Sequence, residues 1–383
     1  MATPTPTPVP KPADNGVAPA PAQAVRPAPA APRPVSALPT RPPAAPVKPK
    51  SRLGQVQRGI QRVPLRHLFY GPRGVGKTSL GADAPNPLFI DVEGGSLTFN
   101  ATRYTFRDEP GGHVPRTYEE FLTAIDDLIA NPGHGYLSLV IDTMDALETL
   151  IHEYICRRDG KANIEAYGYG KGYKIPLVEI RVLLERFDRI IHSGVAIIIL
   201  AHSDEKTYKN PRGPDYDRFK AQLNEIAWGK FAAWCDVCGF INFEGGGAAL
   251  KGDESQAKRA RGWSTGRRMI QLTPDAAAPD VKCRLALPTE LELGEAHPWA
   301  PFASAKLKAE EATVETLTVD ILAEVDRITG GDHAVEFTTD AGTKTSHAAI
   351  LDLATNSDAS VLSRVLAGLK ATAPIVATQE TTP

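Results

Sequence analysis

Residues with the types and spacing needed for phosphate chemistry lie in one short stretch, Gly71-x-x-x-x-Gly76-Lys77-Thr78, directly after an apolar run. Glycines allow such a loop to turn its backbone N–H groups towards phosphate oxygens, which is the geometry of a P-loop. We expect Lys77 to reach the β and γ phosphates of ATP and the Thr78 hydroxyl to bind Mg²⁺. A helix that starts near Gly76 would add the positive end of its dipole. The predicted nucleotide-binding residues are Gly71, Pro72, Arg73, Gly74, Val75, Gly76, Lys77, Thr78 and Ser79.

Two acidic residues could complete a site for ATP hydrolysis, which needs a carboxylate for the metal ion and a group that positions water. Asp142 ends an apolar stretch in the manner of a Walker B strand, so we expect it to support Mg²⁺. Residue 143 is threonine, so no second acid follows directly. Glu93, after the preceding apolar run, is the predicted catalytic base, and Asp91 competes with it for this role. Otherwise Asp142 is a helix N-cap and Glu93 an exposed loop acid.

His202 follows the most apolar run of the chain, residues 195–201. At the end of a buried strand near a P-loop, its side chain could sense the γ-phosphate and pass that state to the next segment. The alternative is a histidine at the edge of the core, satisfied by backbone groups. The predicted catalytic residues are therefore Lys77, Glu93, Asp142 and His202.

Two segments have the composition of nucleic-acid-binding loops. Residues 159–174 interleave tyrosines with lysines and glycines, and residues 203–218 combine charges of both signs with tyrosines and prolines, as in a loop ordered by a ligand. Aromatic rings stack on the bases of single-stranded DNA while lysines contact its backbone. Loops rich in tyrosine and glycine also pack against protein, which is the alternative. The predicted nucleic-acid-binding residues are Tyr167, Tyr169, Lys171, Tyr173, Lys174, Lys206, Lys209 and Arg212.

A particular fold is needed to bring these residues together. From Pro64 onwards, short apolar runs alternate with helical patterns, which predicts an α/β domain with a parallel sheet covered on both faces. Ligands of such sheets bind at the carboxyl ends of the strands, where the P-loop already lies. The expected strands are 66–70, 88–92, 137–141, 195–201, 236–243 and 268–272, and the expected helices are 77–83, 117–130, 146–157, 177–192 and 219–233, whereas 245–262 is expected to be a mobile loop.

Composition divides the 383 residues into three parts. Residues 1–60 are basic and rich in proline and alanine, which predicts a disordered arm. Residues 61–300 are expected to form the ATPase domain, and residues 301–383 an acidic helical region. The net charge of −2 points to no class of partner.

Membrane and disulfide signals are weak in this sequence. No apolar run approaches the length of a membrane span, and four cysteines are too few for a disulfide framework. We therefore expect a soluble, cytoplasmic protein without membrane contact. Cys235 and Cys238 lie in a strand candidate, and we predict buried cysteines rather than half of a zinc site.

These motifs resemble the core of RecA/RadA-like P-loop ATPases, which have an AAA-type ATP-binding domain. The resemblance covers about residues 60–295 and rests on the P-loop, on Glu93 after the second strand instead of after Walker B, and on a polar residue, His202, at the end of the following strand. More closely, the chain looks like phage-encoded nucleotide-binding proteins of single-strand annealing and recombination. RecA itself has glutamine at the position of His202.

The resemblance implies a RecA-like P-loop NTPase core with a mainly parallel central sheet flanked by helices, a disordered N-terminal arm and a small helical C-terminal region. It also implies an ATP- and Mg²⁺-dependent protein that binds single-stranded DNA in phage recombination, annealing or replication, in the cytoplasm of a bacterial host. A homo-oligomer is expected, with a single-strand-binding or replication protein as a further partner.

In such oligomers a cation of one subunit reaches the phosphates bound by its neighbour. The sequence offers Arg212, Arg218, Arg267, Arg268 and Lys282 for this role and does not choose among them. Two other functions fit the same motifs. One is a nucleotide-dependent protein-interaction switch with little turnover, and the other is a P-loop kinase of small substrates.

Overall fold

The computed structural model describes residues 63–108, 112–249, 260–332, 334, 336–339 and 343–372. The predicted N-terminal arm lies outside these residues. In chain order the strands and helices are β1 (Arg66–Gly71), α1 (Lys77–Ala82), β2 (Pro87–Asp91), η2 (Gly95–Thr98), β3 (Thr102–Arg103), α2 (Tyr118–Ala130), β4 (Ser138–Asp142), α3 (Met144–Arg158), η3 (Ile164–Tyr167), η4 (Lys171–Lys174), α4 (Leu177–His192), β5 (Ala196–Tyr208), β6 (Tyr216–Ala221), α5 (Glu225–Trp234), β7 (Val237–Ala249), β8 (Ala260–Gln271), β9 (Lys282–Cys283), β10 (Glu290–Leu293), α6 (Ala300–Thr329), β11 (Glu336–Thr338), β12 (Lys344–Ser346), α7 (His347–Asn356) and α8 (Ala359–Ala371).

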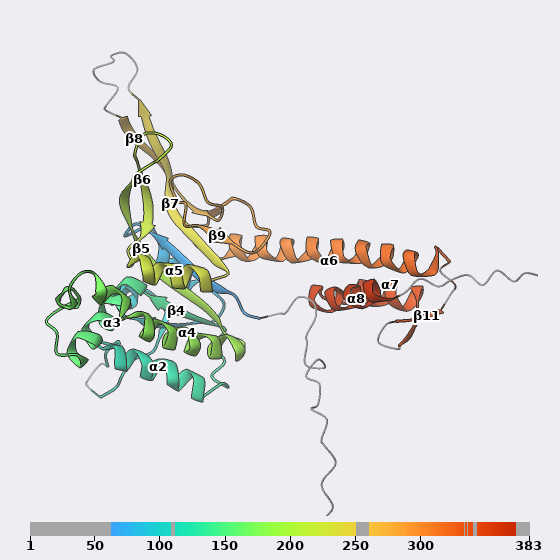
Figure 1. The fold of residues 1–383 in the computed structure, drawn as a ribbon, viewed down its shortest axis with the longest axis horizontal. Coiled ribbons are helices and arrows are strands. Elements are labelled where there is room, and N and C mark those ends of the chain that lie inside the picture. Colours follow the sequence, from blue (N-terminus) through green and yellow to red (C-terminus); the bar gives the residue numbers. More distant parts are fainter. Residues whose placement is uncertain are drawn as a thin grey trace, which may run out of the picture. The chain divides into compact units, whose positions relative to one another are not determined.

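One large mixed sheet organises the described part of the chain (Figure 1). Its order is β10-β8-β7-β1-β5-β4-β2-β3, and the strands from β7 to β3 are parallel to their neighbours. Strands β8 and β10 continue the sheet in antiparallel fashion, and β6 pairs with the second half of β5. The expected α/β domain with a mainly parallel central sheet is therefore confirmed.

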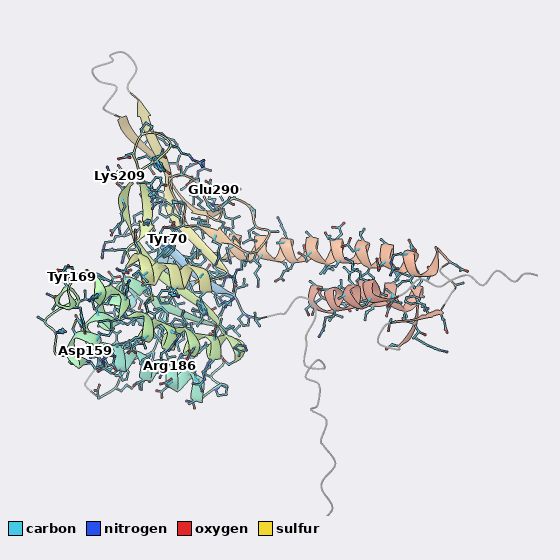
Figure 2. The ribbon with its side chains drawn as sticks, viewed as in Figure 1. Tyr70, Asp159, Tyr169, Arg186, Lys209 and Glu290 are labelled. Atoms are coloured by element: carbon cyan, nitrogen blue, oxygen red, sulfur yellow. The ribbon has the colours of Figure 1, made fainter. Side chains whose placement is uncertain are left out.

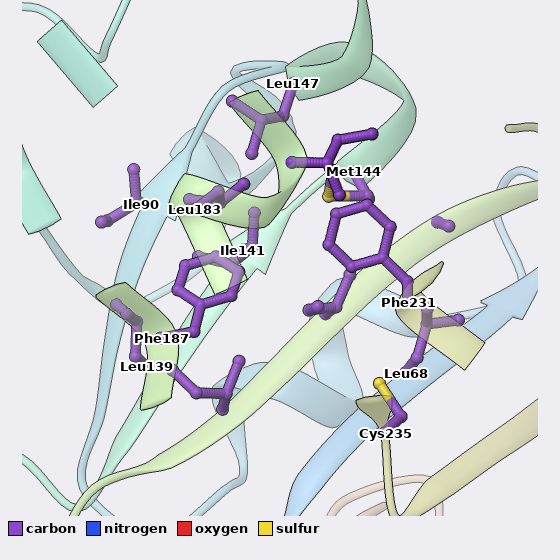
Figure 3. Packing of buried hydrophobic residues seen from close by; sticks show 14 of the residues in the cluster. Leu68, Ile90, Leu139, Ile141, Met144, Leu147, Leu183, Phe187, Phe231 and Cys235 are labelled. Atoms are coloured by element: carbon purple, nitrogen blue, oxygen red, sulfur yellow. The ribbon is translucent and has the colours of Figure 1, made fainter. Parts of the chain in front are cut away.

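Side chains of the inner strands alternate between two hydrophobic clusters, as the pleat requires. Leu68 and Tyr70 of β1 belong to the cluster that includes α2, α3, α4 and α5, part of which is drawn in Figure 3. Phe69, between them, belongs to a second cluster with α1 and the start of α6. Helices thus cover both faces of the sheet, and buried apolar runs such as that of β4 follow from this double covering.

Most predicted elements are present, but two predicted loops are strands. Residues 203–218 were expected to be a loop, and they instead form a hairpin in which β5 continues to Tyr208 and β6 returns from Tyr216. Residues 245–262 were expected to be a mobile loop, yet β7 extends to Ala249 and β8 starts at Ala260. In both cases pairing between the two arms satisfies the backbone, so that polar or glycine-rich sequence remains extended. Residues 250–259 between these arms lie outside the described part.

The helix α6 contributes to two hydrophobic clusters. Near its start, Phe302 and the preceding Trp299 pack against His67 and Phe69 of β1, with ring centroids 5.4 to 6.2 Å apart. Its C-terminal half contributes to a separate cluster with β11, α7 and α8. The short β11–β12 pair had not been expected from the sequence. Within the described residues, no helix combines the length and apolar character needed to cross a bilayer.

The contact of α6 with β1 can be tested by truncating one ring. Phe302 is only 1% exposed, and we expect Phe302→Ala to lower the free energy of unfolding of the sheet domain by about 3–5 kcal/mol, because it leaves a cavity beside Phe69. Denaturant titration provides the measurement. Leu307→Ala on the same helix is the control, since Leu307 is 57% exposed and its truncation should cost less than about 0.5 kcal/mol. Equal costs would contradict the packing described here.

Candidate functional site

The P-loop connects the end of β1 to the start of α1. Gly74 and Gly76 have φ values of 76° and 94°, a region that only glycine adopts readily. A side chain at Gly76 would also collide with Arg268 of β8, because an added Cβ would lie 2.3 Å from the arginine Nη1. Arg268 is fixed there by hydrogen bonds to the carbonyl oxygens of Gly294 and Glu295, at 2.6 and 3.3 Å. The positive φ therefore favours glycine at position 76, and a larger residue there would also displace the end of the Arg268 side chain.

Lys77 and Thr78 follow at the start of α1, where the predicted phosphate and metal ligands were expected. Lys77 Nζ donates to the carbonyl oxygens of Gly71 and Pro72, both at 2.9 Å. Burial lowers the pKa of this lysine to about 8, despite the nearby carboxylates. The Thr78 hydroxyl donates to Asp142 Oδ2 at 2.8 Å. Lysine, threonine and the Walker B aspartate thus meet at one edge of the sheet.

Asp142 is a buried carboxylate with 2% exposure. Burial raises its pKa to about 6; the hydrogen bond from Thr78 opposes this shift, and the charges of Asp91 and Glu93 add to it. An excess of buried negative charge beside a hydroxyl oxygen suits a hard divalent cation, because Mg²⁺ prefers oxygen ligands. Thr78 and Asp142 therefore fit the predicted metal ion.

Of the two acids at the end of β2, Asp91 is the last residue of the strand, and its carboxylate is occupied by the loop that follows. Its carboxylate accepts hydrogen bonds from the backbone N–H groups of Glu93, Gly94 and Ser96, at 2.6 to 3.1 Å, and from the Ser96 hydroxyl at 2.6 Å. Such a fully used carboxylate holds a turn and has little capacity left for water. Glu93 is different, because its side chain is directed towards the P-loop and bonds to Arg73 Nη1 at 3.0 Å. Of the two, Glu93 is the acid whose geometry suits a base.

His202, where β5 leaves the buried sheet, lies between two carboxylates. Its backbone N–H and its ring Nδ1 lie 2.9 Å from the two oxygens of Asp145, on the first turn of α3. Its Nε2 is 3.8 Å from Glu93 Oε2. Burial alone would raise the pKa of Asp145, but the hydrogen bonds from His202 outweigh burial and the net shift is downward. The ring of His202 is thus bound by the Asp145 side chain. The alternative of a histidine satisfied only by backbone groups does not describe it.

The four predicted catalytic residues line one cavity of about 340 Å³. Its lining comprises Arg73, Gly74, Gly76, Lys77, Thr78, Ser79, Glu93, Gly95, Phe99, Asp142, Thr143 and His202. Of the predicted nucleotide-binding residues, Gly71, Pro72 and Val75 are absent from this lining. Gly71 instead packs tightly on the Ile241 carbonyl, Pro72 accepts from Lys77, and Val75 is buried in the core. These three residues therefore support the conformation of the P-loop without lining the cavity.

The predicted nucleic-acid-binding residues fall into two places (Figure 2). In the segment after α3, Tyr167 donates to Asp159 at 2.6 Å and Tyr173 contacts His152, whereas Tyr169 is fully exposed and Lys171 and Lys174 are exposed. The other three residues, Lys206, Lys209 and Arg212, lie in the β5–β6 hairpin or its turn.

The β5–β6 hairpin carries different chemistry on its two faces. Residues opposite one another in the ladder share a face, and the pairs Lys206–Arg218 and Tyr208–Tyr216 form a basic and aromatic face. Arg218 lies 4.5 Å above the Tyr208 ring, and the two tyrosine centroids are 5.4 Å apart. Phe219, on the other face, stacks on Phe240 of β7, so the basic face is directed away from β7.

Several contacts of this site had not been assigned from the sequence. Arg73 as a partner of Glu93, Asp145 as the partner of His202, and Arg268 beside Gly76 all depend on contacts between distant segments. The role of Asp145 could have been predicted from the sequence, because an acid on the first helical turn after the Walker B strand lies beside the end of the neighbouring strand. Among the cations considered for a neighbouring subunit, Arg267 pairs with Glu244 and Lys282 donates to the carbonyl of Ala232.

Cys235 and Cys238 are buried, as predicted, with both residues 0% exposed. They lie at the entry to β7 and belong to the cluster that packs under α5. Burial raises the pKa of the Cys235 thiol well above its usual range. These cysteines therefore act as small apolar side chains in the core.

The fold and the site define a P-loop NTPase. A protein-family model described as an AAA domain, AAA_24, matches residues 64–279, and the chain belongs to this family. No curated protein matches the chain.

Several solved structures show similarity to the chain. A RadB recombinase is 12% identical with a TM-score of 0.34, and the match covers 61% of this chain and 90% of the RadB chain. The flagellar accessory protein FlaH of Methanocaldococcus jannaschii is 9% identical with a TM-score of 0.28, covering 60% and 84%. A KaiC-like protein of Pyrococcus horikoshii OT3 is 12% identical with a TM-score of 0.29, covering 60% and 85%.

The burial of Asp142 predicts a dependence of stability on pH. Because its folded-state pKa of about 6 exceeds the ordinary 3.8, the folded state binds more protons between these values, and the contribution of Asp142 to stability falls as pH rises through that window. We expect Asp142→Asn to raise the free energy of unfolding of the nucleotide-free protein at pH 7.5 by about 1–3 kcal/mol. Urea titrations at pH 7.5 and 4.5 provide the measurement, and the gain should shrink at the lower pH.

The control for this prediction is Asp320→Asn, which removes an exposed carboxylate of α6 and should change stability little at either pH. A loss of stability in Asp142→Asn at pH 7.5 would show that the ionised carboxylate is net stabilising, against the argument from burial.

Proposed function

We propose that this chain is an ATP-hydrolysing, single-stranded-DNA-binding protein that acts in recombination or annealing, as an oligomer. The observation that carries the proposal is the continuity of one strand. β5 supplies His202 to the cavity that holds the P-loop lysine, and the same strand then continues into the hairpin with the basic and aromatic face. A phage origin and a role beside a single-strand-binding or replication protein belong to the same proposal and rest on the resemblance of the motifs.

In the proposed ATP site, Lys77 and the N–H groups of the P-loop bind the phosphates. Thr78 and Asp142 hold Mg²⁺, which neutralises developing phosphate charge when bound. Glu93 accepts the proton of the attacking water. Its present partner Arg73 lies on the P-loop itself, so an anion bound there competes with Glu93 for the guanidinium and frees the carboxylate.

In the proposed DNA site, Lys206 and Arg218 contact phosphates and Tyr208 and Tyr216 stack on bases. Lys209 and Arg212 lie in the turn of the hairpin and would add phosphate contacts, for which Lys209 must leave its ion pair with Asp215. The segment 159–174 supplies a second contact through Tyr169, Lys171 and Lys174, whereas Tyr167 and Tyr173 stabilise the segment through Asp159 and His152.

Two other functions are tested by the same experiments. A nucleotide-dependent protein-interaction switch would bind ATP with little turnover and would not bind DNA. A P-loop kinase would transfer phosphate to a small acceptor, and its hydrolysis would not depend on DNA. The basic hairpin face favours DNA over both, because neither alternative requires lysine and arginine interleaved with tyrosine.

The ATP site is tested by steady-state hydrolysis with and without single-stranded DNA at low salt. We expect DNA to stimulate hydrolysis by the wild type, and Lys77→Ala to reduce it about 100-fold or more, because the transferred phosphate loses a charge-stabilising donor. The control is Lys230→Ala, which removes an exposed lysine of α5. Hydrolysis that is indifferent to DNA would favour the kinase, and absent hydrolysis with tight ATP binding would favour the switch.

The DNA site is tested by the salt dependence of binding to a fluorescent oligothymidylate. We expect Lys206→Ala combined with Arg218→Ala to weaken binding about tenfold and to reduce the slope of log K against log salt by about 1.4, at about 0.7 per lost phosphate contact. Glu205→Ala combined with Asp217→Ala on the opposite face is the control and should not weaken binding.

The same titration with Tyr169→Ala combined with Lys171→Ala measures the contribution of the segment 159–174. These variants should lower DNA affinity and spare ATP binding. Unchanged affinity would remove this segment from the DNA site, and unchanged affinity in the hairpin variants would remove the hairpin.

A further inference from the structure

Two carboxylates of α3 hold the base of the β5–β6 hairpin. Asp145 and Glu148 are one turn apart on this helix, and both are largely buried, with a 14% exposed side chain for Asp145 and 8% exposure for Glu148. Residues three apart on a helix project from the same side. Here both project towards residues 202–224, which include the whole hairpin and its two connections to the sheet.

Asp145 binds the ascending side of the hairpin. One of its oxygens accepts from the backbone N–H of His202 and the other lies 2.9 Å from the ring Nδ1. An ionised carboxylate can only accept, so the proton must be on Nδ1, and Nε2 is left facing Glu93. A single side chain thereby fixes the backbone, the ring orientation and the tautomer of His202.

Glu148 binds the descending side. Both of its oxygens accept from the backbone N–H of Asn224, at 3.2 and 3.0 Å. Asn224 in turn caps α5, because its side-chain oxygen accepts from Ile226 N. The base of the hairpin is closed by the Gln222 N–H, which donates to the His202 carbonyl at 2.7 Å. The two ends of the hairpin are therefore joined to each other and to α3.

We propose that Asp145 and Glu148 are positioning residues that transmit the state of Glu93 through His202 to the β5–β6 hairpin. When Glu93 leaves Arg73, its unpaired carboxylate faces the unprotonated Nε2 of His202, and the two acceptors repel each other. The ring cannot rotate away, because Asp145 holds Nδ1, so the displacement passes to the His202 backbone and to Gln222. Glu148 keeps the descending side attached to the same helix, and the hairpin responds as one unit. This inference rests on the proposed function, since it presumes that ATP binds at the P-loop.

Amide hydrogen exchange of residues 203–221, with and without a non-hydrolysable ATP analogue and Mg²⁺, measures this transmission without DNA. Burial raises the pKa of Glu148 to about 6, opposed by the hydrogen bond from Asn224, so the assay is run at pH 8, where the carboxylate is ionised. In the wild type we expect the analogue to change exchange in the hairpin by about threefold or more.

Asp145→Asn should bind the analogue within about twofold of the wild type and lose the change in exchange. In the introduced amide an NH2 donor replaces one of the two carboxylate oxygens, and each oxygen serves a different group of His202, so the backbone N–H and the Nδ1–H can no longer both be held in the present geometry. Glu148→Ala should lose the change as well, and Glu148→Gln should recover most of it, since the amide oxygen still accepts from Asn224 N–H.

Glu153→Gln, at an exposed position of the same helix, is the matched control and should behave as the wild type. Thermal melting of each variant identifies any that has not folded, and where Glu148→Ala does not fold the loss of the response is tested with Asp145→Asn, while Glu148→Gln should still retain it.

The outcomes separate this inference from the proposed function. Wild-type exchange that does not respond to the bound analogue overturns the inference, as does a response that Asp145→Asn and Glu148→Ala retain. A response that these variants lose supports it, even if the protein proves not to bind DNA, in which case only the DNA-binding proposal fails.

Discussion

Parallel pairing of β1, β5, β4 and β2 is the constraint on which the site depends, because it brings four strand ends to one edge of the sheet. In this register Gly71 lies opposite His202, and Asp91 lies opposite Asp142. A slip of one residue in any pair would exchange the two faces of a strand and move these polar side chains into the core. The apolar segments that precede them therefore set the positions of the candidate catalytic groups.

The charges gathered at this edge are not balanced within the protein. Burial lowers the pKa of Lys77 and raises that of Asp142, so each group carries its charge at a cost in the nucleotide-free state. In the proposed ATP site, a nucleotide with its metal ion would supply the missing partners for both. The nucleotide-free protein is thus less stable because of these buried charges, and ligand binding would restore that stability. This is typical of functional sites.

The sequence was most informative where one residue type could meet a physical requirement. The P-loop glycines, Lys77 and the buried strand that ends in Asp142 follow from local chemistry and hydrophobic pattern, and the structure brings them together as expected. The hairpin of β5 and β6 was missed because its polar sequence is extended only through pairing between its two arms. Asp145 and Arg268 were not assigned their contacts because their partners are distant in sequence.

Anchoring of the hairpin as far as Phe219, and not at its turn, has a consequence for how such a protein can diversify. Every contact described here that ties the β5–β6 hairpin to the ATP site is made at or below His202 and Gln222, while the turn at residues 209–215 bonds mainly to itself. The turn can therefore be lengthened, shortened or replaced while the ATP site beneath it is retained. Relatives with one ATP site and different turns would recognise different ligands, and the hairpin would be the exchangeable part.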